Sequence, residues 1–153
     1  MRKIVITGIG ICSPLGNCPE SFIASALVGK NAIGPISKID ASDFAVHIGG
    51  EIKETDHYEG LSSKKHGLLP RIARWAVSAA RAAVSDAELE LTEATRRSVD
   101  IVMGVGAPSL DAVEEQAVKI SKEGPDAASL STPILMNPCN PAIQIGIDLD
   151  LRG

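Results

Sequence analysis

The stretch M-R-K-I-V-I-T-G-I-G-I-C-S-P-L-G, residues 1–16, decides the fold class of this chain. Residues 4–6 (Ile-Val-Ile) form a β-branched run without polar alternation, which is typical of a strand buried on both faces of a sheet. Gly8 and Gly10 then end the run abruptly. The sequence therefore predicts that the chain opens with a buried strand followed by a glycine-containing turn.

A helix is predicted to follow over residues 19–29. Asn17 can cap it, and Glu20 stands where a capping box places its acidic residue. Hydrophobic residues recur at helical spacing, and Gly29 provides a stop. Strand, turn and helix in this order indicate an α/β domain.

A glycine turn between a strand and a helix is also a feature of dinucleotide-binding proteins. Their Gly-x-Gly-x-x-Gly fingerprint fails here, because Ser13 follows Gly8 and Gly10 where the third glycine should stand. The related short-chain dehydrogenase pattern would need glycines at two positions that hold Cys12 and Pro14. We therefore disfavour a small nucleotide-binding protein and interpret the glycines as residues that let a buried strand turn.

The composition indicates one globular domain over residues 1–153, with no second domain. Hydrophobic residues make up 44% and charged residues 22% of the chain, which is ordinary for a soluble protein. A net charge of −4 predicts no nucleic-acid partner. No apolar run approaches the roughly 20 residues of a bilayer span, and the first strand begins at the amino terminus, so we expect neither membrane attachment nor a signal peptide.

The cysteines and histidines do not suggest a metal centre. Three cysteines are scattered without metal-ligand spacing: Cys12, Cys18 and Cys139. Three histidines lie in polar, turn-rich sequence: His47, His57 and His66. An odd number of unclustered cysteines is expected in a reducing compartment, so we predict a cytoplasmic protein with no metal ion and no cofactor.

Further along the chain, residues 30–59 read as a surface segment with a short hairpin or excursion near residues 45–52. Residues 62–66 are a polar, basic patch that we interpret as a solvated loop. A strong amphipathic, alanine-rich helix is predicted over residues 70–88. Its small residues would allow close approach to another element, which is a structural role.

The second half repeats the strand, turn and helix pattern. Residues 98–106 predict a second buried strand ending in glycines, and residues 110–123 a helix that Ser109 can cap. Residues 127–141, with three prolines, predict a loop. From residue 143 to 151, hydrophobic and polar residues alternate, and this period of two by itself predicts a strand with one solvated face.

Several motifs occur in an order and at a spacing typical of one family. They are K-I-V-I-T-G-I-G-I-C-S-P-L-G at 3–16, G-K-N-A-I-G-P-I-S-K-I-D-A-S-D-F at 29–44, I-G-G-E-I-K at 48–53, A-A-R-A-A-V-S-D-A-E-L from Ala79, and G-V-G at 104–106. With these motifs the sequence resembles the amino-terminal part of β-ketoacyl-acyl carrier protein synthases, condensing enzymes of the thiolase fold. The resemblance implies a thiolase-like α/β fold, present here as an incomplete amino-terminal half-domain.

The resemblance also implies a chemistry, a decarboxylating Claisen condensation of acyl and malonyl thioesters in fatty-acid or polyketide synthesis. In the family a cysteine in a Thr-Ala-Cys-Ala-Ser strand-to-helix turn accepts the acyl group, and it lies downstream of the segment that residues 149–153 resemble. The histidines that assist decarboxylation belong to the family's carboxy-terminal half. We therefore expect no catalytic residue within residues 1–153, and no activity of this chain alone.

The cysteines of this chain are not expected to replace that nucleophile. Cys139 lies in N-P-C-N-P, where flanking prolines disfavour a turn that opens a helix and no histidine is placed to activate the thiol. Cys12 resembles a family position that is structural.

The resemblance assigns two further regions. Three residues are expected near the acyl pocket: Gly106, Ala107 and Pro108. Five residues are expected near the dimer interface: Asn137, Pro138, Cys139, Asn140 and Pro141. The family segment that follows the interface loop is a helix, so we predict a helix over residues 142–148, against the period of two.

Two departures from the family pattern concern the same regions. Family members usually continue with more glycine after Gly106, whereas Ala107 and Pro108 follow here and predict a stiffer turn. Residues 68–70, Leu-Leu-Pro, stand where a basic residue and an aspartate usually precede the alanine-rich helix.

Two functional hypotheses follow. The chain is either the amino-terminal fragment of a 3-oxoacyl-[acyl-carrier-protein] synthase, or a non-catalytic partner subunit that binds an intact synthase. Both predict apolar surface and sheet edges that need covering by another chain. The expected partners are acyl carrier protein and a second synthase-type chain, either a homodimer mate or a different subunit.

Overall fold

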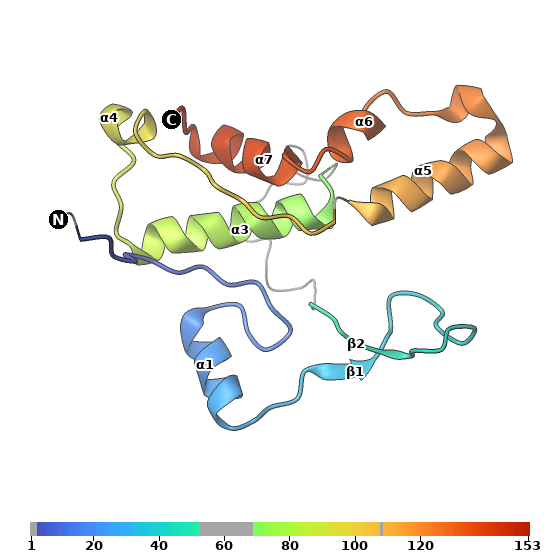
Figure 1. The fold of residues 1–153 in the computed structure, drawn as a ribbon, viewed down its shortest axis with the longest axis horizontal. Helices are drawn as coiled ribbons and strands as arrows, with labels where there is room; N and C mark the ends of the chain where they lie inside the picture. Colours follow the sequence, from blue (N-terminus) through green and yellow to red (C-terminus); the bar gives the residue numbers. More distant parts are fainter. Residues whose placement is uncertain (1–2, 53–68, 108) are drawn as a thin grey trace. The chain divides into compact units, whose positions relative to one another are not determined.

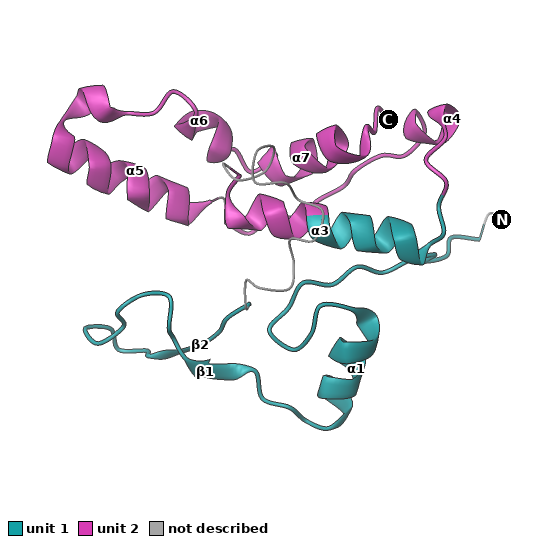
Figure 2. Cartoon of the chain, turned by 180° about the vertical axis from the view of Figure 1, so that it is seen from behind, with its two compact units in different colours: residues 1–59, 78–89 teal, residues 60–77, 90–153 magenta. Residues whose placement is uncertain are grey.

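The computed structural model of the chain describes residues 3–52, 69–107 and 109–153. Figures 1 and 2 show its elements and its two compact units. Unit 1 comprises residues 1–59 and 78–89, and unit 2 comprises residues 60–77 and 90–153. The long helix α3, Arg71–Asp86, contributes its first turns to unit 2 and its remaining turns to unit 1.

Unit 1 contains the first predicted helix, α1, which spans Pro19–Leu27. Its amino-terminal cap is Cys18, so the prediction of Asn17 as the cap is wrong. The Ser21 hydroxyl accepts hydrogen bonds from the backbone N–H groups of Asn17 and Cys18 at 3.2 and 3.4 Å, so Ser21 stands at the third helical position of a capping box that begins at Cys18. Gly29 follows the helix with a φ of +66°, which confirms the predicted stop.

The sheet of unit 1 is a two-stranded antiparallel pair. Strand β1, Ile33–Pro35, pairs with β2, Ile48–Gly50, so that Ile33 faces Gly50 across the ladder. Of the hairpin predicted near residues 45–52, only one strand, β2, lies in that range. The other strand, β1, lies in the earlier segment that follows α1. Strand pairing depends on which extended segments the fold brings side by side.

The strand predicted for residues 4–6 is wrong in this structure. The backbone there is irregular, and the side chains are 97%, 71% and 84% exposed in the order Ile4, Val5, Ile6. A β-branched run becomes a buried strand only when neighbouring strands accept its hydrogen bonds and cover its faces. Among the described residues, no strand pairs with this segment.

The glycines of the same segment lie against the alanine-rich part of α3. A Cβ added at Gly8 would stand 2.6 Å from Ala87 N, and one added at Gly10 would stand 2.7 Å from Ala79 C and 2.9 Å from Ala83 N. Ile9 N, between them, donates to Asp86 Oδ2 at 2.8 Å. The predicted role of the small residues of α3, close approach to another element, is confirmed here for backbone against helix.

Unit 2 is helical in its described part. It contains α4 (Glu93–Arg96), α5 (Leu110–Glu123), the 3-10 turn η2 (Pro125–Ala127), α6 (Thr132–Leu135) and α7 (Asn140–Leu149). Its buried hydrophobic residues are Ala73 and Val77 of α3 and Ile145 of α7. Helix α5 confirms the predicted 110–123 helix, with Gly124 at its end in a positive φ of 89°.

The second predicted strand, residues 98–106, is also wrong. The segment is irregular, and Val102 is 97% exposed. The physical reason is the same as for residues 4–6, since no described strand of the unit offers a ladder to it. Both runs have strand composition, and neither has a partner that would make it a strand.

The loop predicted for residues 127–141 is only partly correct, because α6 and the first turn of α7 fall inside it. Pro133 and Pro141 occupy first-turn positions of these two helices. Proline is tolerated there because the first-turn N–H groups have no intrahelical partner to lose. The helix predicted over residues 142–148 is confirmed as part of α7, so the period of two misleads at this point.

Some predictions lie outside the described residues: the basic patch 62–66, His57, His66 and Pro108.

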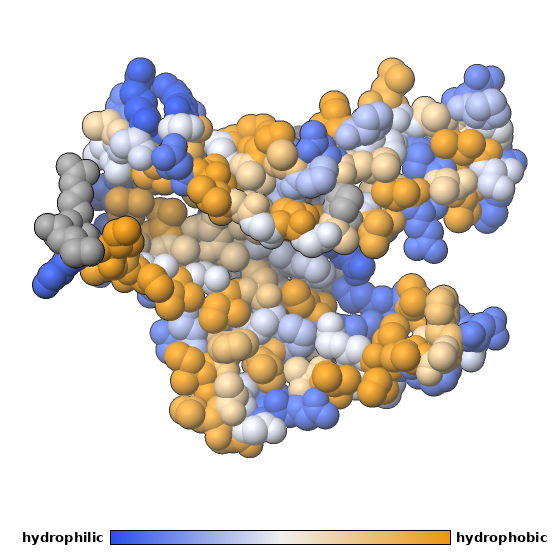
Figure 3. All heavy atoms as spheres, in the orientation of Figure 1, coloured by the Kyte–Doolittle hydropathy of each residue, from blue (hydrophilic) through white to orange (hydrophobic). Residues whose placement is uncertain are grey.

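Hydrophobic side chains lie at the surface over α1, as the space-filling view shows (Figure 3). Leu27, at the end of α1, is 82% exposed. No residue of α1 is buried, so its apolar face is open to solvent.

The contact between Gly10 and α3 predicts a large effect of one methyl group. We expect Gly10→Ala to destabilise the chain by roughly 1–3 kcal/mol, because the new Cβ would collide with the backbone of Ala79 and Ala83. Gly34→Ala is the matched control, because its Cβ would meet nothing within 4 Å. Urea unfolding followed by circular dichroism measures both, and equal midpoints for the two variants would contradict the close approach.

Candidate functional site

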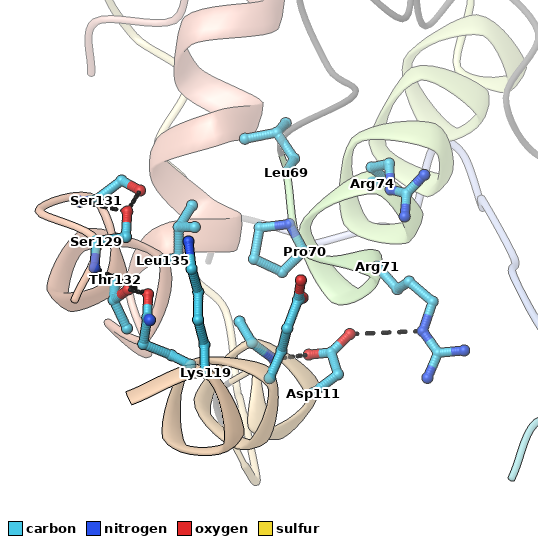
Figure 4. Close-up of a pocket in the computed structure, with 13 residues that line it drawn as sticks. Leu69, Pro70, Arg71, Arg74, Asp111, Lys119, Ser129, Ser131, Thr132 and Leu135 are labelled. Atoms are coloured by element: carbon cyan, nitrogen blue, oxygen red, sulfur yellow. Dashed lines mark hydrogen bonds and ion pairs between the residues drawn. The ribbon is translucent and has the colours of Figure 1, made fainter. Parts of the chain in front are cut away.

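A cavity of about 450 Å³ lies within unit 2, between the start of α3, helix α5 and the segment that leads into α6 (Figure 4). Its charged lining residues are Arg71, Arg74, Asp111, Glu115 and Lys119. The Arg71 guanidinium lies 3.5 Å from the Asp111 carboxylate and 5.7 Å from the centre of the Trp75 ring. These two contacts hold Arg71 at the rim by charge and by a cation–π interaction.

Gln116 connects, by hydrogen bonds, the segments that form one wall of this cavity. Its Oε1 accepts hydrogen bonds from Ser129 N at 3.0 Å and from Thr132 Oγ1 at 2.8 Å, and its Nε2 donates to Ala127 O at 3.3 Å. One side chain of α5 thus fixes both η2 and the start of α6. The carboxamide is committed to these contacts, so its role here is to shape the wall.

A second cavity, of about 380 Å³, lies within unit 1 between the Ser13–Gly16 turn, the residues before β1, and Glu51. The Glu51 carboxylate accepts from Ser37 Oγ at 2.6 Å, Ser37 N at 3.0 Å and Lys38 N at 3.1 Å. These hydrogen bonds, chiefly those from Ser37, hold the pKa of Glu51 below its usual range. Glu51 therefore serves as an ionised clamp on the loop after β1.

The residues predicted near an acyl pocket lie in the irregular segment before α5. Gly106 and Ala107 are exposed, and Pro108 lies outside the described residues. A Cβ added at Gly104 or Gly106 would meet nothing within 4 Å, so the chain is open around both positions. Neither Gly106 nor Ala107 lines either cavity described above.

The residues predicted near an interface form the turn into α7. Asn137, Pro138 and Cys139 are exposed, whereas Asn140 and Pro141 are buried. Asn137 Oδ1 accepts from Cys139 N at 2.9 Å, and Asn140 Nδ2 donates to Ile134 O at 3.3 Å. The structure thus brings these five residues together as one hydrogen-bonded turn, with its first three side chains at the surface.

Cys12 and Cys139 differ in their surroundings. Burial raises the pKa of the Cys12 thiol, and a hydrogen bond with Ser78 opposes this shift only in part. Cys139 is exposed and caps the amino terminus of α7, so the argument that its prolines prevent a helix from starting there is wrong. Its φ of −77° and ψ of −10° continue directly into helical geometry, which the first-turn position of Pro141 permits.

Sequence analysis missed a polar network at the end of α7. Arg96 of α4 donates from Nε to Leu91 O at 2.8 Å and from Nη1 to Leu149 O. The backbone of Arg152 returns a bond to Arg96 O at 2.7 Å. An arginine in the helical last turn gives no sequence signal for such contacts, because Leu149 stands 53 positions away.

Within residues 3–52, 69–107 and 109–153, no group of three or more His, Cys, Asp or Glu side chains could hold a metal ion. In the same ranges, no helix has both the length and the apolar character needed to cross a membrane.

Comparison with solved structures defines the class of fold. The ishigamide ketosynthase/chain length factor matches with a TM-score of 0.80 at 24% identity, over 96% of this chain and 37% of that chain. A β-ketoacyl synthase from Burkholderia phymatum STM815 matches with a TM-score of 0.81 at 21% identity, over 100% of this chain and 38% of that chain. The predicted fold class, α/β and thiolase-like, is confirmed.

Sequence comparison then identifies the family. The family described as beta-ketoacyl synthase, N-terminal domain, matches residues 1–153, and the chain belongs to it. A 3-oxoacyl-[acyl-carrier-protein] synthase 2 from Synechocystis sp. is 33% identical over 84% of this chain and 31% of the relative. One from Staphylococcus aureus (strain COL) is 31% identical over 99% of this chain and 37% of the relative, so the chain spans about a third of the length of these relatives.

The hydrogen bonds of Gln116 predict that it stabilises unit 2. We expect Gln116→Leu to cost about 1–3 kcal/mol, because Ser129 N and Thr132 Oγ1 lose their acceptor. Urea unfolding measures the loss, and Glu114→Gln, an exposed change on the same helix, is the control. A Gln116→Leu midpoint equal to that of the control would show that these bonds contribute nothing.

The hydrogen bonds of Glu51 predict that the loop after β1 is sensitive to acid. Because hydrogen bonds lower the pKa of Glu51 in the fold, the stabilisation is fully present above the ordinary glutamate pKa and is lost as the pH falls through the lowered pKa. The amide proton shifts of Ser37 and Lys38 should titrate together in this acid range. In Glu51→Gln, both shifts should be independent of pH, and persistence of the same titration there would assign it to another group.

Proposed function

We propose that residues 1–153 serve as the amino-terminal part of a 3-oxoacyl-[acyl-carrier-protein] synthase in fatty-acid or polyketide synthesis. The reaction is the decarboxylating condensation of an acyl thioester with a malonyl thioester. One observation carries the proposal: relatives bearing that synthase name match 99% of this chain at 31% identity. Because these relatives are synthases, they favour this hypothesis over that of a non-catalytic partner subunit.

In this proposal residues 1–153 act as one partial domain that supplies scaffold, and the reacting cysteine and histidines stand elsewhere in the synthase. Burial raises the pKa of the Cys12 thiol, which suits a structural residue. The polar side chains of Gln116, Glu51 and Arg96 bind backbone groups of the chain itself. Groups committed in this way support a framework role.

We assign two regions of this scaffold on the same basis. Gly106, Ala107 and Pro108 lie near the acyl pocket, and the open space around Gly106 supports this. The turn from Asn137 to Pro141 lies near the interface with a second synthase-type chain, and the exposure of Asn137, Pro138 and Cys139 supports this. The proposed partners are therefore acyl carrier protein and that second chain.

The exposed apolar runs support the proposal that further polypeptide of the synthase covers this surface. Ile4, Val5 and Ile6 are largely exposed, as is Val102. Exposed β-branched runs are suited to joining a sheet whose other strands come from elsewhere in the synthase. The working compartment in this proposal is the cytoplasm, where the three free cysteines would stay reduced.

The test begins with the protein as its own host makes it. An affinity tag added before Met1 in the host gene allows gentle purification, and native mass spectrometry gives the mass of every polypeptide that carries or accompanies residues 1–153. The purified species is then assayed for condensation with acyl and malonyl thioesters of acyl carrier protein. We expect turnover by a species that contains additional polypeptide.

The 153-residue chain expressed alone is the matched comparison. We expect it to show no turnover above the level without enzyme, because in this proposal the reacting cysteine and histidines stand elsewhere in the synthase. Turnover by this chain alone would overturn the scaffold role. Absence of turnover from the species purified from the host would overturn the synthase proposal itself.

A further inference from the structure

The end of α7 is bound to α4 by a charge-assisted hydrogen bond from Arg96 to Leu149 O. The Arg96 guanidinium is partly buried and donates to two carbonyl oxygens, Leu91 O at 2.8 Å and Leu149 O. Bonds from an ionised donor are stronger than neutral ones, and partial burial protects them from competing water. Arg96 thus ties the last residue of α7 to a segment that lies 53 positions earlier in the chain.

Beyond α7 the backbone turns back along residues 96–99. Asp150 adopts a left-handed φ of 52°, and Leu151 N donates to Gly146 O at 2.9 Å, which closes the helix. Arg152 N then donates to Arg96 O at 2.7 Å. We refer to Arg96 together with Leu149 O and Arg152 N as the α7 anchor.

The backbone at Gly153 lies so close to residues 99–100 that it leaves no space for a side chain. A Cβ added at Gly153 would stand 2.5 Å from Val99 O and 3.0 Å from Asp100 Oδ1. A side chain there would push the backbone away from residues 99–100. The path after α7 therefore depends on Arg96 at one point and on the absence of a side chain at another.

Surface ion pairs near the anchor have a smaller role. Arg152 contacts Glu93 Oε1 at 3.1 Å and Asp150 Oδ2 at 2.9 Å, and all three side chains are about half exposed. Exposed pairs of this kind contribute little, because water screens them. Arg97, next to Arg96, contacts the Glu93 carboxylate at 2.9 Å and is exposed, so it provides a neighbouring arginine without the anchor's backbone contacts.

We propose that Arg96 is a positioning residue of the synthase, acting through the α7 anchor to fix the direction in which the polypeptide leaves α7. This inference rests on the proposed function. If reacting groups follow this segment, their placement depends on how the backbone passes residues 96–99. A misplacement of only about 1 Å at reacting groups costs on the order of a hundredfold in rate.

The test uses the species purified from the host, with substitutions made in the gene. We expect Arg96→Gln to lower kcat by about 10–100-fold while KM for the acyl thioester changes by less than about twofold. Arg96→Lys should recover part of kcat, because an ammonium can donate to one of the two carbonyls. Arg97→Gln should keep both parameters within about twofold of the parent.

A kcat for Arg96→Gln equal to that of the parent, or an equal loss in Arg97→Gln, would overturn the proposal. If Arg96→Gln does not yield folded protein, Gly153→Ala is the second test of the proposal. It disturbs the backbone path after α7 and leaves Arg96 in place. We expect the same selective loss of kcat there. An unchanged kcat in Gly153→Ala would then overturn the proposal.

A separate measurement distinguishes failure of this proposal from failure of the proposed function. If the purified parent species shows no condensation, the synthase proposal has failed, and amide hydrogen exchange of the 153-residue chain tests the anchor. The Arg152 amide should exchange slowly in the parent chain and at least about tenfold faster in Arg96→Gln, because its acceptor moves. Equal exchange rates would overturn the anchor.

Discussion

The structure depends on where backbone hydrogen bonds can be made. A helix satisfies its N–H and C=O groups within one segment, whereas a strand needs a neighbour for every ladder bond. The backbone hydrogen bonds of helices α1, α3, α5 and α7 are made within each segment, so local sequence signals suffice to predict them. The extended runs at residues 4–6 and 98–106 have strand composition, and the described chain offers no ladder to either.

This difference explains how much of the fold could be predicted from the sequence. Gly29 and Gly124, with positive φ values of 66° and 89°, end α1 and α5 where the sequence places the stops. The composition of residues 4–6 correctly indicates a segment suited to a sheet, but composition carries no information about which strand lies beside it. Pairing is non-local, so it is decided by the rest of the fold.

Helix α7 shows the converse case, in which a local pattern misleads. Its alternating residues predict a strand, but Pro141 fits the first helical turn and Asp150 closes the last one in a left-handed conformation. Ile145 is buried while Ile143 and Ile147 are 48% and 58% exposed. Hydrophobic residues on more than one side of a helix can reproduce a period of two, so the resemblance to a family was the better guide here.

The candidate site was harder to predict than the helices, because its contacts join residues distant in the sequence. Gln116 reaches residues 127–132, and Arg96 reaches Leu149, and neither side chain stands in a motif that would mark it. The residues at 137–141 form a local turn with a hydrogen bond between Asn137 and Cys139, and their placement near an interface, which came from the resemblance to a family, stays a prediction.

The same contacts bear on what these residues do in a synthase. The carboxamide of Gln116, the carboxylate of Glu51 and the guanidinium of Arg96 each bind at least two backbone or hydroxyl groups of the chain itself. A side chain held in this way fixes a backbone path. In this part of the family fold, these polar side chains are therefore used to set the geometry of the backbone.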